Sequence, residues 1–291
     1  MELLEKQKMP LWDYVILTAS NESQAQSYRM QIQYRLDHGM LPKSIHYAVL
    51  PDPDGKRVGS GGATLNVLRY IHQDAGSFDD KRILVIHSGG DSKRVPQYSA
   101  CGKLFSPVPR LLPNGRRSTL FDEFMISMCG VAARIRAGML VCSGDVLLLF
   151  NPLQIDFYGS GAAALSIKEP AEIGKNHGVY RVDEQGNVGG FLHKKTVDQL
   201  HELQAADENG NVDIDTGAVI MDTDLLKALY KLVDTPEQFD AYVNENTRLS
   251  FYADFLYPLA SQSSLEQYYK ETPEGDFTPE LHECRTKLWE V

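Results

Sequence analysis

Two hydrophobic periods alternate along the first half of the chain. Short apolar runs rich in β-branched residues predict strands, and apolar positions that return every three or four residues between them predict helices. The predicted strands are 14–18, 45–50, 82–87 and 139–142, and the predicted helices are 22–38, 63–71 and 120–136. Strands that alternate with helices and end in glycine-rich turns indicate an α/β domain. We expect an open, mostly parallel sheet covered by helices on both faces.

The second half of the chain is less regular. Its pattern predicts strands at 162–168 and 212–221, a hairpin formed by 178–182 and 188–192, and a helix at 224–233. Ligands of open α/β sheets bind outside the carboxyl ends of the strands. The residues that follow each predicted strand are therefore the first candidates for chemistry.

Composition and charge narrow the possible partners. The 291 residues include 39 acidic and 29 basic side chains, a net charge of −10, which argues against a nucleic-acid partner. No apolar run has the length of a membrane span, and the N-terminus lacks the apolar core of a signal peptide. The four cysteines lack zinc-site spacing and suit reduced thiols. We predict a cytoplasmic protein without nucleic-acid or membrane partners; its oligomeric state stays open.

The segment from Ile86 to Lys103 carries the strongest chemical signal. It follows a predicted buried strand and contains Gly89-Gly90, the cation pair Lys93-Arg94, and a second glycine before Lys103. A glycine-rich, cationic loop after a strand brings backbone N–H groups and positive charge against a polyanion. A nucleoside triphosphate is the obvious candidate.

Two common glycine motifs do not fit these residues. A Walker loop requires Ser or Thr after Gly-Lys, but Leu104 follows Gly102-Lys103. The earlier glycine cluster, Gly59-Ser60-Gly61-Gly62, has Thr64 where a dinucleotide-binding motif has its third glycine. The chain therefore needs another kind of nucleotide site.

The loop from Gly89 to Pro96, followed by Lys103, resembles the signature of the sugar nucleotidyltransferases. Ser92 stands where many members carry glycine. Three segments, 51–66, 87–96 and 176–179, resemble the fucose-1-phosphate guanylyltransferase branch, and the similarity runs over most of residues 13–260. The resemblance implies a Rossmann-like, GT-A-like fold. It also implies Mg²⁺-dependent conversion of GTP and β-L-fucose 1-phosphate to GDP-L-fucose and pyrophosphate.

The resemblance implies roles for the residues that would meet the nucleotide and the metal. Arg94 would clamp the β- and γ-phosphates, and Lys93 and Lys103 would supply point charges. Backbone N–H groups would hold phosphate oxygens at Gly89, Gly90, Asp91 and Ser92. The loop Gly59-Ser60-Gly61-Gly62, which precedes the helix predicted at 63–71, would bind a base edge or a phosphate, or would serve only as a tight strand-to-helix turn. Asp145 would bind Mg²⁺, with Asp254 as a second carboxylate or only a partly exposed helical residue.

The second half of the chain would hold the sugar phosphate. The turn Asn176-His177-Gly178 would contact the sugar or the ribose, or would serve only as a turn. Lys194-Lys195 would meet the phosphate, or would simply end a hairpin. The hexose would be recognised by Asp213, Asp215, Thr216 and Gly217. The other histidines, His193 among them, are scattered and are predicted to be structural.

The resemblance also predicts a domain division and leaves alternatives. Proteins of this branch continue into a left-handed β-helix and, in bifunctional members, into a sugar kinase. Residues 1–261 would form the nucleotidyltransferase domain, and 262–291 an extension that leads toward the β-helix. The sequence is expected to be an N-terminal fragment or a natural chain limited to this domain. Two other functions stay open: transfer from UTP or to another hexose, and a nucleotide-sugar binding module without catalysis.

Overall fold

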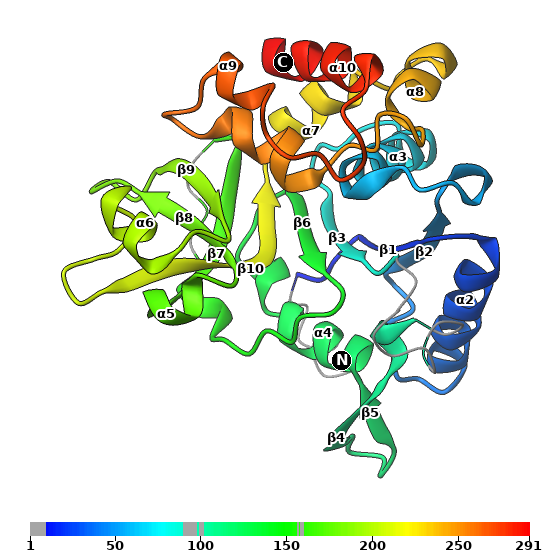
Figure 1. The fold of residues 1–291 in the computed structure, drawn as a ribbon. Helices are drawn as coiled ribbons and strands as arrows, with labels where there is room; N and C mark the ends of the chain where they lie inside the picture. The colour runs from blue at the N-terminus through cyan, green and yellow to red at the C-terminus, as the bar shows by residue number, and fades with distance from the viewer. Residues whose placement is uncertain (1–9, 90–97, 99–101, 156, 158–159) are drawn as a thin grey trace.

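The computed structural model describes residues 10–89, 98, 102–155, 157 and 160–291. Its centre is an eight-stranded mixed sheet in the order β2-β1-β3-β6-β10-β8-β9, with β7 also paired to β10 (Figure 1). The first four strands in this order are parallel. They are β2 (His46–Pro51), β1 (Tyr14–Ala19), β3 (Arg82–His87) and β6 (Gly138–Ser143). All four were predicted from the apolar runs.

The other half of the sheet is antiparallel. Its longest strand, β10, runs opposite to β6 on one side and to β7 and β8 on the other. The strands are β10 (Asn211–Met221), β7 (Ala162–Pro170), β8 (Gly178–Val182) and β9 (Val188–His193). The predicted hairpin is confirmed as β8 and β9. The expectation of a mostly parallel sheet holds only for the first half, because hairpin connections need no crossover helix.

Helices cover both faces of the sheet, as the pattern predicted. Alternate residues of β1 point to opposite sides: Tyr14 and Ile16 join one buried cluster, and Val15 and Leu17 join the other. One cluster packs under α2 (Glu22–Asp37) and α4 (Leu120–Met128). The opposite cluster packs under α3 (Gly59–Ala75), α7 (Thr223–Tyr230) and α10 (Pro279–Glu290). Figure 1 shows these two groups on opposite sides of the strands.

Shorter elements complete the fold. The remaining α-helices are α5 (Ala171–Gly174), α6 (Val197–Glu202), α8 (Pro236–Tyr242) and α9 (Leu265–Tyr268). The hairpin of β4 (Pro107–Leu111) and β5 (Arg117–Thr119) projects from the body (Figure 1). A π-helical turn, η6 (Phe251–Leu256), continues into the 3₁₀ turn η7 (Tyr257–Leu259). Within the described ranges, no helix is both long and apolar enough to cross a bilayer.

Helix α4 is shorter than the sequence suggested. The pattern predicted a helix over 120–136, but α4 ends at Met128 and is followed by a 3₁₀ turn, Val131–Ala133. Gly130 lies against the ring of Pro152, and a Cβ on Gly130 would come within 2.7 Å of the ring Cγ. Glycine is a weak helix former, which favours the end of the α-helix near this position. Its lack of a side chain also leaves room for the Pro152 ring.

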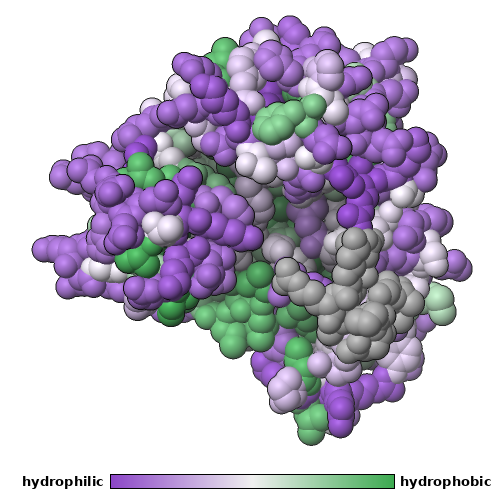
Figure 2. Space-filling model, viewed as in Figure 1, coloured by the Kyte–Doolittle hydropathy of each residue, from purple (hydrophilic) through white to green (hydrophobic). Residues whose placement is uncertain are grey.

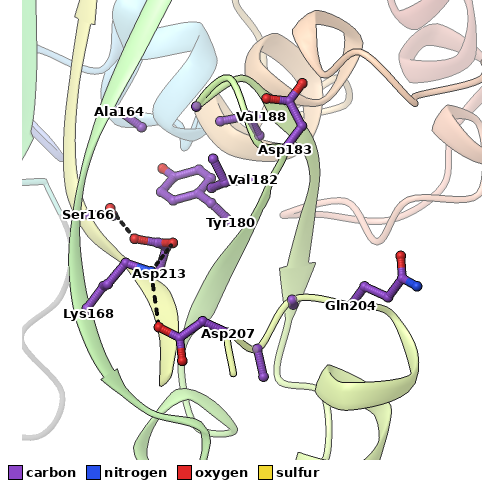
Figure 3. Close-up of a pocket in the computed structure, with 13 residues that line it drawn as sticks. Ala164, Ser166, Lys168, Tyr180, Val182, Asp183, Val188, Gln204, Asp207 and Asp213 are labelled. Carbon is purple, nitrogen blue, oxygen red and sulfur yellow. Dashed lines mark hydrogen bonds and ion pairs between the residues drawn. The ribbon is translucent and has the colours of Figure 1, made fainter. Parts of the chain in front are cut away.

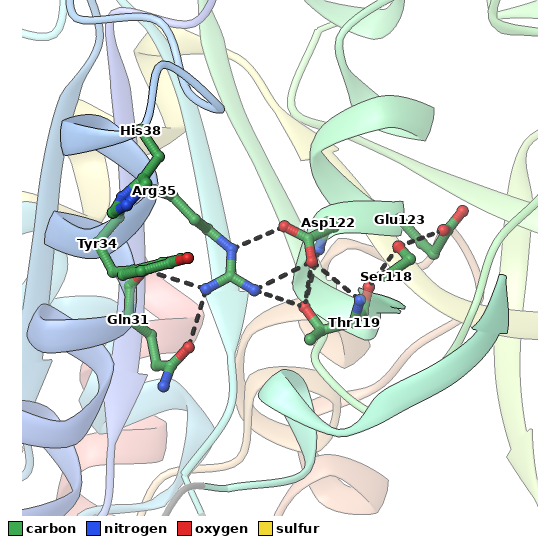
Figure 4. Close-up of polar contacts among 8 residues, drawn as sticks. All are labelled: Gln31, Tyr34, Arg35, His38, Ser118, Thr119, Asp122 and Glu123. Atoms are coloured by element: carbon green, nitrogen blue, oxygen red, sulfur yellow. Dashed lines mark hydrogen bonds and ion pairs between the residues drawn. The ribbon is translucent and has the colours of Figure 1, made fainter. Parts of the chain in front are cut away.

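A buried ion pair joins α2 to α4 (Figure 4). Arg35 donates from Nε to Asp122 Oδ1 at 2.7 Å and from Nη2 to Oδ2 at 3.0 Å. Burial raises the pKa of Asp122, but the hydrogen bonds from Arg35 and Thr119 outweigh it and leave that pKa lowered. Asp122 also closes a capping box with Thr119 at the start of α4. The pair thereby fixes the two helices of this face relative to each other.

The C-terminal segment belongs to the same core. Leu281, Cys284 and Leu288 of α10 pack in the cluster that also contains residues of β1, β3 and β6. Arg285 donates from Nε to Asp254 Oδ1 at 2.7 Å, and both side chains are fully buried. Residues 262–291 therefore complete the hydrophobic face that α3 and α7 begin.

Replacement of Arg285 by methionine tests this ion pair. The variant leaves the Asp254 carboxylate buried without its cation, and we expect unfolding free energy to fall by about 3–5 kcal/mol. Denaturation in urea measures the change. Lys287→Ala on the same helix removes an exposed pair with Glu290 and should cost less than about 1 kcal/mol. Equal losses of unfolding free energy in both variants would show that the buried pair stabilises the fold no more than the exposed pair does.

Candidate active site

The carboxyl ends of β3 and β6 bring two predicted residues together. Lys103, in a 3₁₀ turn over Lys103–Phe105, places Nζ 3.3 Å from Oδ2 of Asp145, which follows β6. Ser143 donates from Oγ to the other carboxylate oxygen at 2.8 Å. The Lys103 and Asp145 side chains are 36% and 53% exposed. A cation and a carboxylate are thus held side by side within reach of a ligand.

The glycine-rich phosphate loop is described only at its two ends. Gly90, Asp91, Ser92, Lys93 and Arg94 lie outside the described residues, and their predicted roles stay predictions. Both ends of the loop meet one side chain of α2. The Tyr28 hydroxyl donates to the Ser88 carbonyl at 3.0 Å. A Cβ on Gly102 would lie 1.8 Å from that hydroxyl oxygen, so position 102 requires glycine.

His87 joins the end of β3 to β1 and to α3. Its ring nitrogens lie 3.2 Å from the hydroxyl of Thr18 in β1 and 3.0 Å from that of Thr64 in α3. Burial lowers the pKa of His87 to about 4. The imidazole is therefore neutral at pH 7 and links β1, β3 and α3 without adding charge.

Asp145 suits a hard divalent cation. Its carboxylate is exposed, and magnesium takes oxygen ligands and keeps several waters or substrate oxygens in its shell. Among the residues that the structure describes, no three His, Cys, Asp or Glu side chains gather as a metal-binding group. The exposed Asp145 carboxylate could therefore contribute one protein oxygen to such a cation.

Asp254 does not fit the predicted role of second metal ligand. The residue is fully buried; its Oδ1 accepts from Arg285 and its Oδ2 accepts from the Ser250 backbone N–H at 2.6 Å. Both carboxylate oxygens are bound inside the core. The structure corrects the prediction, and it also differs from the alternative of a partly exposed helical residue, because Asp254 is fully buried against Arg285.

The Gly59–Gly62 cluster also differs from the expected ligand-binding loop. Gly59, Ser60, Gly61 and Gly62 form the first turn of α3 itself. A Cβ on Gly59, which has φ +79°, would lie 2.2 Å from the carbonyl oxygen of Leu249, and the Gly61 N–H already donates to that carbonyl at 2.8 Å. Close approach of the 248–249 backbone is thus one reason for glycine here.

Ser60 provides the remaining donors of this turn, and Glu274 binds them. The Ser60 backbone N–H donates to Glu274 Oε2 at 3.0 Å, and its hydroxyl donates to Oε1. The same hydroxyl oxygen accepts from the Phe251 N–H at 2.9 Å. Burial raises the pKa of Glu274, and the two bonds from Ser60 lower it. A carboxylate from the C-terminal segment therefore occupies the helix terminus predicted to bind the nucleotide.

A cavity of about 800 Å³ lies between the β8–β9 hairpin and the C-terminal segment. Three predicted sugar-phosphate residues, Gly178, Lys195 and Asp215, line it. Asn176, His177 and Lys194 are not among its lining residues, and all three are exposed. Figure 2 shows this face of the molecule hollowed between the part that carries β8 and β9 and the part that carries α3.

A bulge in β10 sets the position of Asp215. The register with β7 shifts between Asp215 and Ala218, and Gly217 in the bulge has φ +73°. Asp215 Oδ1 accepts from the Tyr180 hydroxyl at 2.9 Å and from the Gly217 N–H at 2.8 Å. Bulges commonly redirect a side chain beside a site. Among the described residues nothing bonds Oδ2, which leaves one acceptor for a sugar hydroxyl.

A smaller cavity, of about 390 Å³, lies beyond Tyr180 (Figure 3). Lys168 forms ion pairs there with Asp207 and Asp213, and Ser166 donates to Asp213 at 3.0 Å. Of the predicted site residues only Asp213 lines this cavity. Its charged groups satisfy one another, so the larger cavity is the better candidate for a ligand.

Several residues of the larger cavity were missed or misjudged from the sequence. Tyr252 and Phe191 face it with stacked rings 5.9 Å apart, and His193, predicted to be structural, also lines it. The chain carried a signal only for Phe191, which lies in the predicted hairpin strand 188–192, and for His193, which directly follows that strand. Tyr252 and Glu274 come from elements that no sequence pattern connects to the sheet.

Comparison with known proteins identifies the family. The sequence model of the fucose pyrophosphorylase domain matches residues 75–291. The chain belongs to this family. The match begins in α3 and includes the Lys103–Asp145 pair, both cavities and the whole C-terminal segment.

Three relatives of this fucose pyrophosphorylase family member are longer proteins. The fucose-1-phosphate guanylyltransferase of Mus musculus is 30% identical over 96% of this chain and 52% of its own length. The human protein of that name is 30% identical over 69% of this chain and 35% of its own length. The bifunctional fucokinase/GDP-fucose pyrophosphorylase of Arabidopsis thaliana is 31% identical over 73% of this chain and 23% of its own length. The chain thus spans about half the length of these relatives, or less.

Asp52, at the carboxyl end of the sheet beside α3, predicts a pH effect on stability. Burial and the charge of Glu274 raise its pKa from 3.8 to about 7, against a hydrogen bond from the Val58 backbone and the charges of Arg57 and Arg248. Between these two pH values the unfolded chain ionises while the folded chain stays protonated, so stability falls as pH rises. Asp52→Asn should abolish that loss in urea denaturation at pH 4 to 8.

The control is Asp54→Asn, two positions away. The Asp54 side chain is exposed, and its backbone has φ +54°, a conformation that both aspartate and asparagine adopt. Its stability should follow the wild type at every pH. A parallel pH dependence in Asp52→Asn and the wild type would contradict the assignment.

Proposed function

We propose that this chain is a nucleotidyltransferase domain that joins GTP and β-L-fucose 1-phosphate to form GDP-L-fucose and pyrophosphate. The observation that carries the proposal is the Lys103–Asp145 pair at the ends of β3 and β6, beside a cavity that contains Asp215 and Lys195. The family match and the names of its relatives support the substrates. We extend the proposal to a GT-A-like arrangement, with the nucleotide over the parallel half of the sheet.

The chemistry assigns separate tasks to the two ends of the site. An oxygen of the sugar phosphate attacks the α-phosphorus of GTP, a new P–O bond forms, and the bond to pyrophosphate breaks. Negative charge gathers on the transferred and departing oxygens, and such transfers depend mainly on positioning and charge stabilisation. Lys103 would stabilise this charge, and Lys93 and Arg94 are proposed to act with it. Mg²⁺ bound at Asp145 would supply further charge neutralisation.

The larger cavity would hold the sugar. Asp215 presents its free carboxylate oxygen to a sugar hydroxyl, and burial raises the pKa of Asp215 while its two hydrogen bonds lower it. Lys195 adds a cation that can balance the phosphate. Lys194, held at φ +48°, sits beside the cavity with its N–H bonded to the His177 carbonyl. We propose that Lys194, Asn176 and His177 shape the rim of the cavity.

Replacement of Lys103 or Asp145 by alanine tests the catalytic assignment. Each should lower kcat by about a hundredfold to a thousandfold, the usual cost of one charge-stabilising group. GDP-fucose affinity should change by less than about tenfold, because the product lacks the departing pyrophosphate. Pyrophosphate release measures the rate, and calorimetry measures the affinity.

The matched control is Lys168→Ala, which removes an exposed cation paired with Asp207 in the smaller cavity. Its kcat should equal that of the wild type. Full activity in both Lys103→Ala and Asp145→Ala would show that the transfer occurs elsewhere.

Wild-type turnover separates the proposed reaction from its two rivals. Pyrophosphate release is measured with GTP and with UTP, each combined with fucose 1-phosphate and with mannose 1-phosphate. Release chiefly with GTP and fucose 1-phosphate supports the proposal. Release with another pair reassigns the substrate, and binding of GDP-fucose without any release would identify a binding module.

A further inference from the structure

The cavity between the β8–β9 hairpin and the C-terminal segment contains one tyrosine whose hydroxyl has no assigned task. Two tyrosines line it, and the hydroxyl of one of them, Tyr257, donates to the Gln267 side chain at 3.2 Å. No other described residue forms a hydrogen bond with the hydroxyl of the second, Tyr252. The Tyr252 side chain is half-buried and its hydroxyl oxygen is open to the cavity, so its donor is free for a ligand that enters there.

The position of this hydroxyl connects the cavity to Asp145. A Cβ on Gly217 would lie 3.4 Å from the Tyr252 oxygen and 2.9 Å from the Cβ of Ser143. Ser143 in turn donates to Asp145, and Gly217 donates to Asp215. The Tyr252 oxygen therefore lies at the junction of the Asp215 cavity and the Asp145 carboxylate.

The ring is held rigidly in this position. Phe191 stacks on it from β9, and Phe251 packs edge-on at 5.5 Å. Its backbone lies in the π-helical turn η6, which is rare in proteins and frequent at functional sites. The buried Asp254–Arg285 pair anchors the same turn. A donor fixed by packing loses little freedom when a ligand binds.

The chemistry of the position selects a phosphate as its partner. A sugar 1-phosphate whose hydroxyls reach Asp215 must place its phosphate toward the nucleotide, and hence between Asp215 and Asp145. These carboxylates would repel the phosphate. Burial, followed by the charges of Asp215, Cys142, Asp145 and Glu274, raises the pKa of Tyr252, so its hydroxyl stays protonated. A neutral donor can bind a phosphate there without a counter-ion.

We propose that Tyr252 donates a hydrogen bond to the phosphate of the sugar 1-phosphate and thereby directs the attacking oxygen toward the nucleotide beside Asp145. This role rests on the proposed function, because it deepens the assignment of the same site. It makes Tyr252 a substrate-contacting residue that reads the phosphate rather than the sugar.

Tyr252→Phe removes only the oxygen and keeps the stacked ring. The variant should show a tenfold to hundredfold lower kcat/KM for β-L-fucose 1-phosphate, the size of a hydrogen bond to a charged group. The KM for GTP should stay within about twofold of the wild type. Tyr269→Phe, which removes a hydroxyl that is bonded to Thr286 outside the cavity, should keep both parameters within about twofold. Thermal melts check that both variants fold as the wild type does.

Unchanged kcat/KM for fucose 1-phosphate in Tyr252→Phe would overturn the inference, as would an equal rise in the KM for GTP. If the wild type uses a different sugar 1-phosphate, the proposed function fails, and the comparison repeated with that substrate still decides the role of Tyr252. If calorimetry shows that the wild type binds no sugar 1-phosphate, the inference and the proposed function fall together.

Discussion

The buried ion pair between Arg285 and Asp254 is the interaction on which the candidate site depends. Arg285 Nη1 also donates to the carbonyls of Tyr268, Tyr269 and Glu271. The Arg285 guanidinium thus connects α10, the turn η6 and the segment that leads from Tyr268 to Glu274. A buried charge without its partner costs several kcal/mol, so these segments are stable only together. The cavity wall formed by Tyr252 and Glu274 exists because this pair forms.

The mixed sheet divides the site into two chemical halves. The parallel strands end in loops that present Lys103 and Asp145, whereas the antiparallel strands contribute Phe191 and Asp215 to the wall of the larger cavity. Strand β10 belongs to both halves, because it pairs with β6 on one side and with β7 and β8 on the other. Its bulge at Gly217 is where the two halves meet.

Local pattern was sufficient for the strands of the central sheet but not for the β4–β5 hairpin. The pattern placed the loop that ends at Lys103, and Asp145, after parallel strands, where ligands of such sheets bind, and the two side chains meet there. Pattern failed where the partner is remote. The role of Asp254 depends on Arg285. Glycine stands at position 59 because the Leu249 backbone lies close to it, and not only because of a ligand. Tyr252 and Glu274 reach the site only through tertiary packing, which no spacing in the chain reveals.

The contact of Glu274 with Ser60 links two distant parts of the chain. The Ser60 hydroxyl serves Glu274 and the Phe251 backbone at once, so the effect of a substitution at one of these positions depends on the residue at the other. Alanine at position 60 would leave the Glu274 carboxylate without its hydroxyl donor, whereas alanine at position 274 would leave the Ser60 hydroxyl without its acceptor. Positions 60 and 274 should therefore vary as a pair when related sequences diverge.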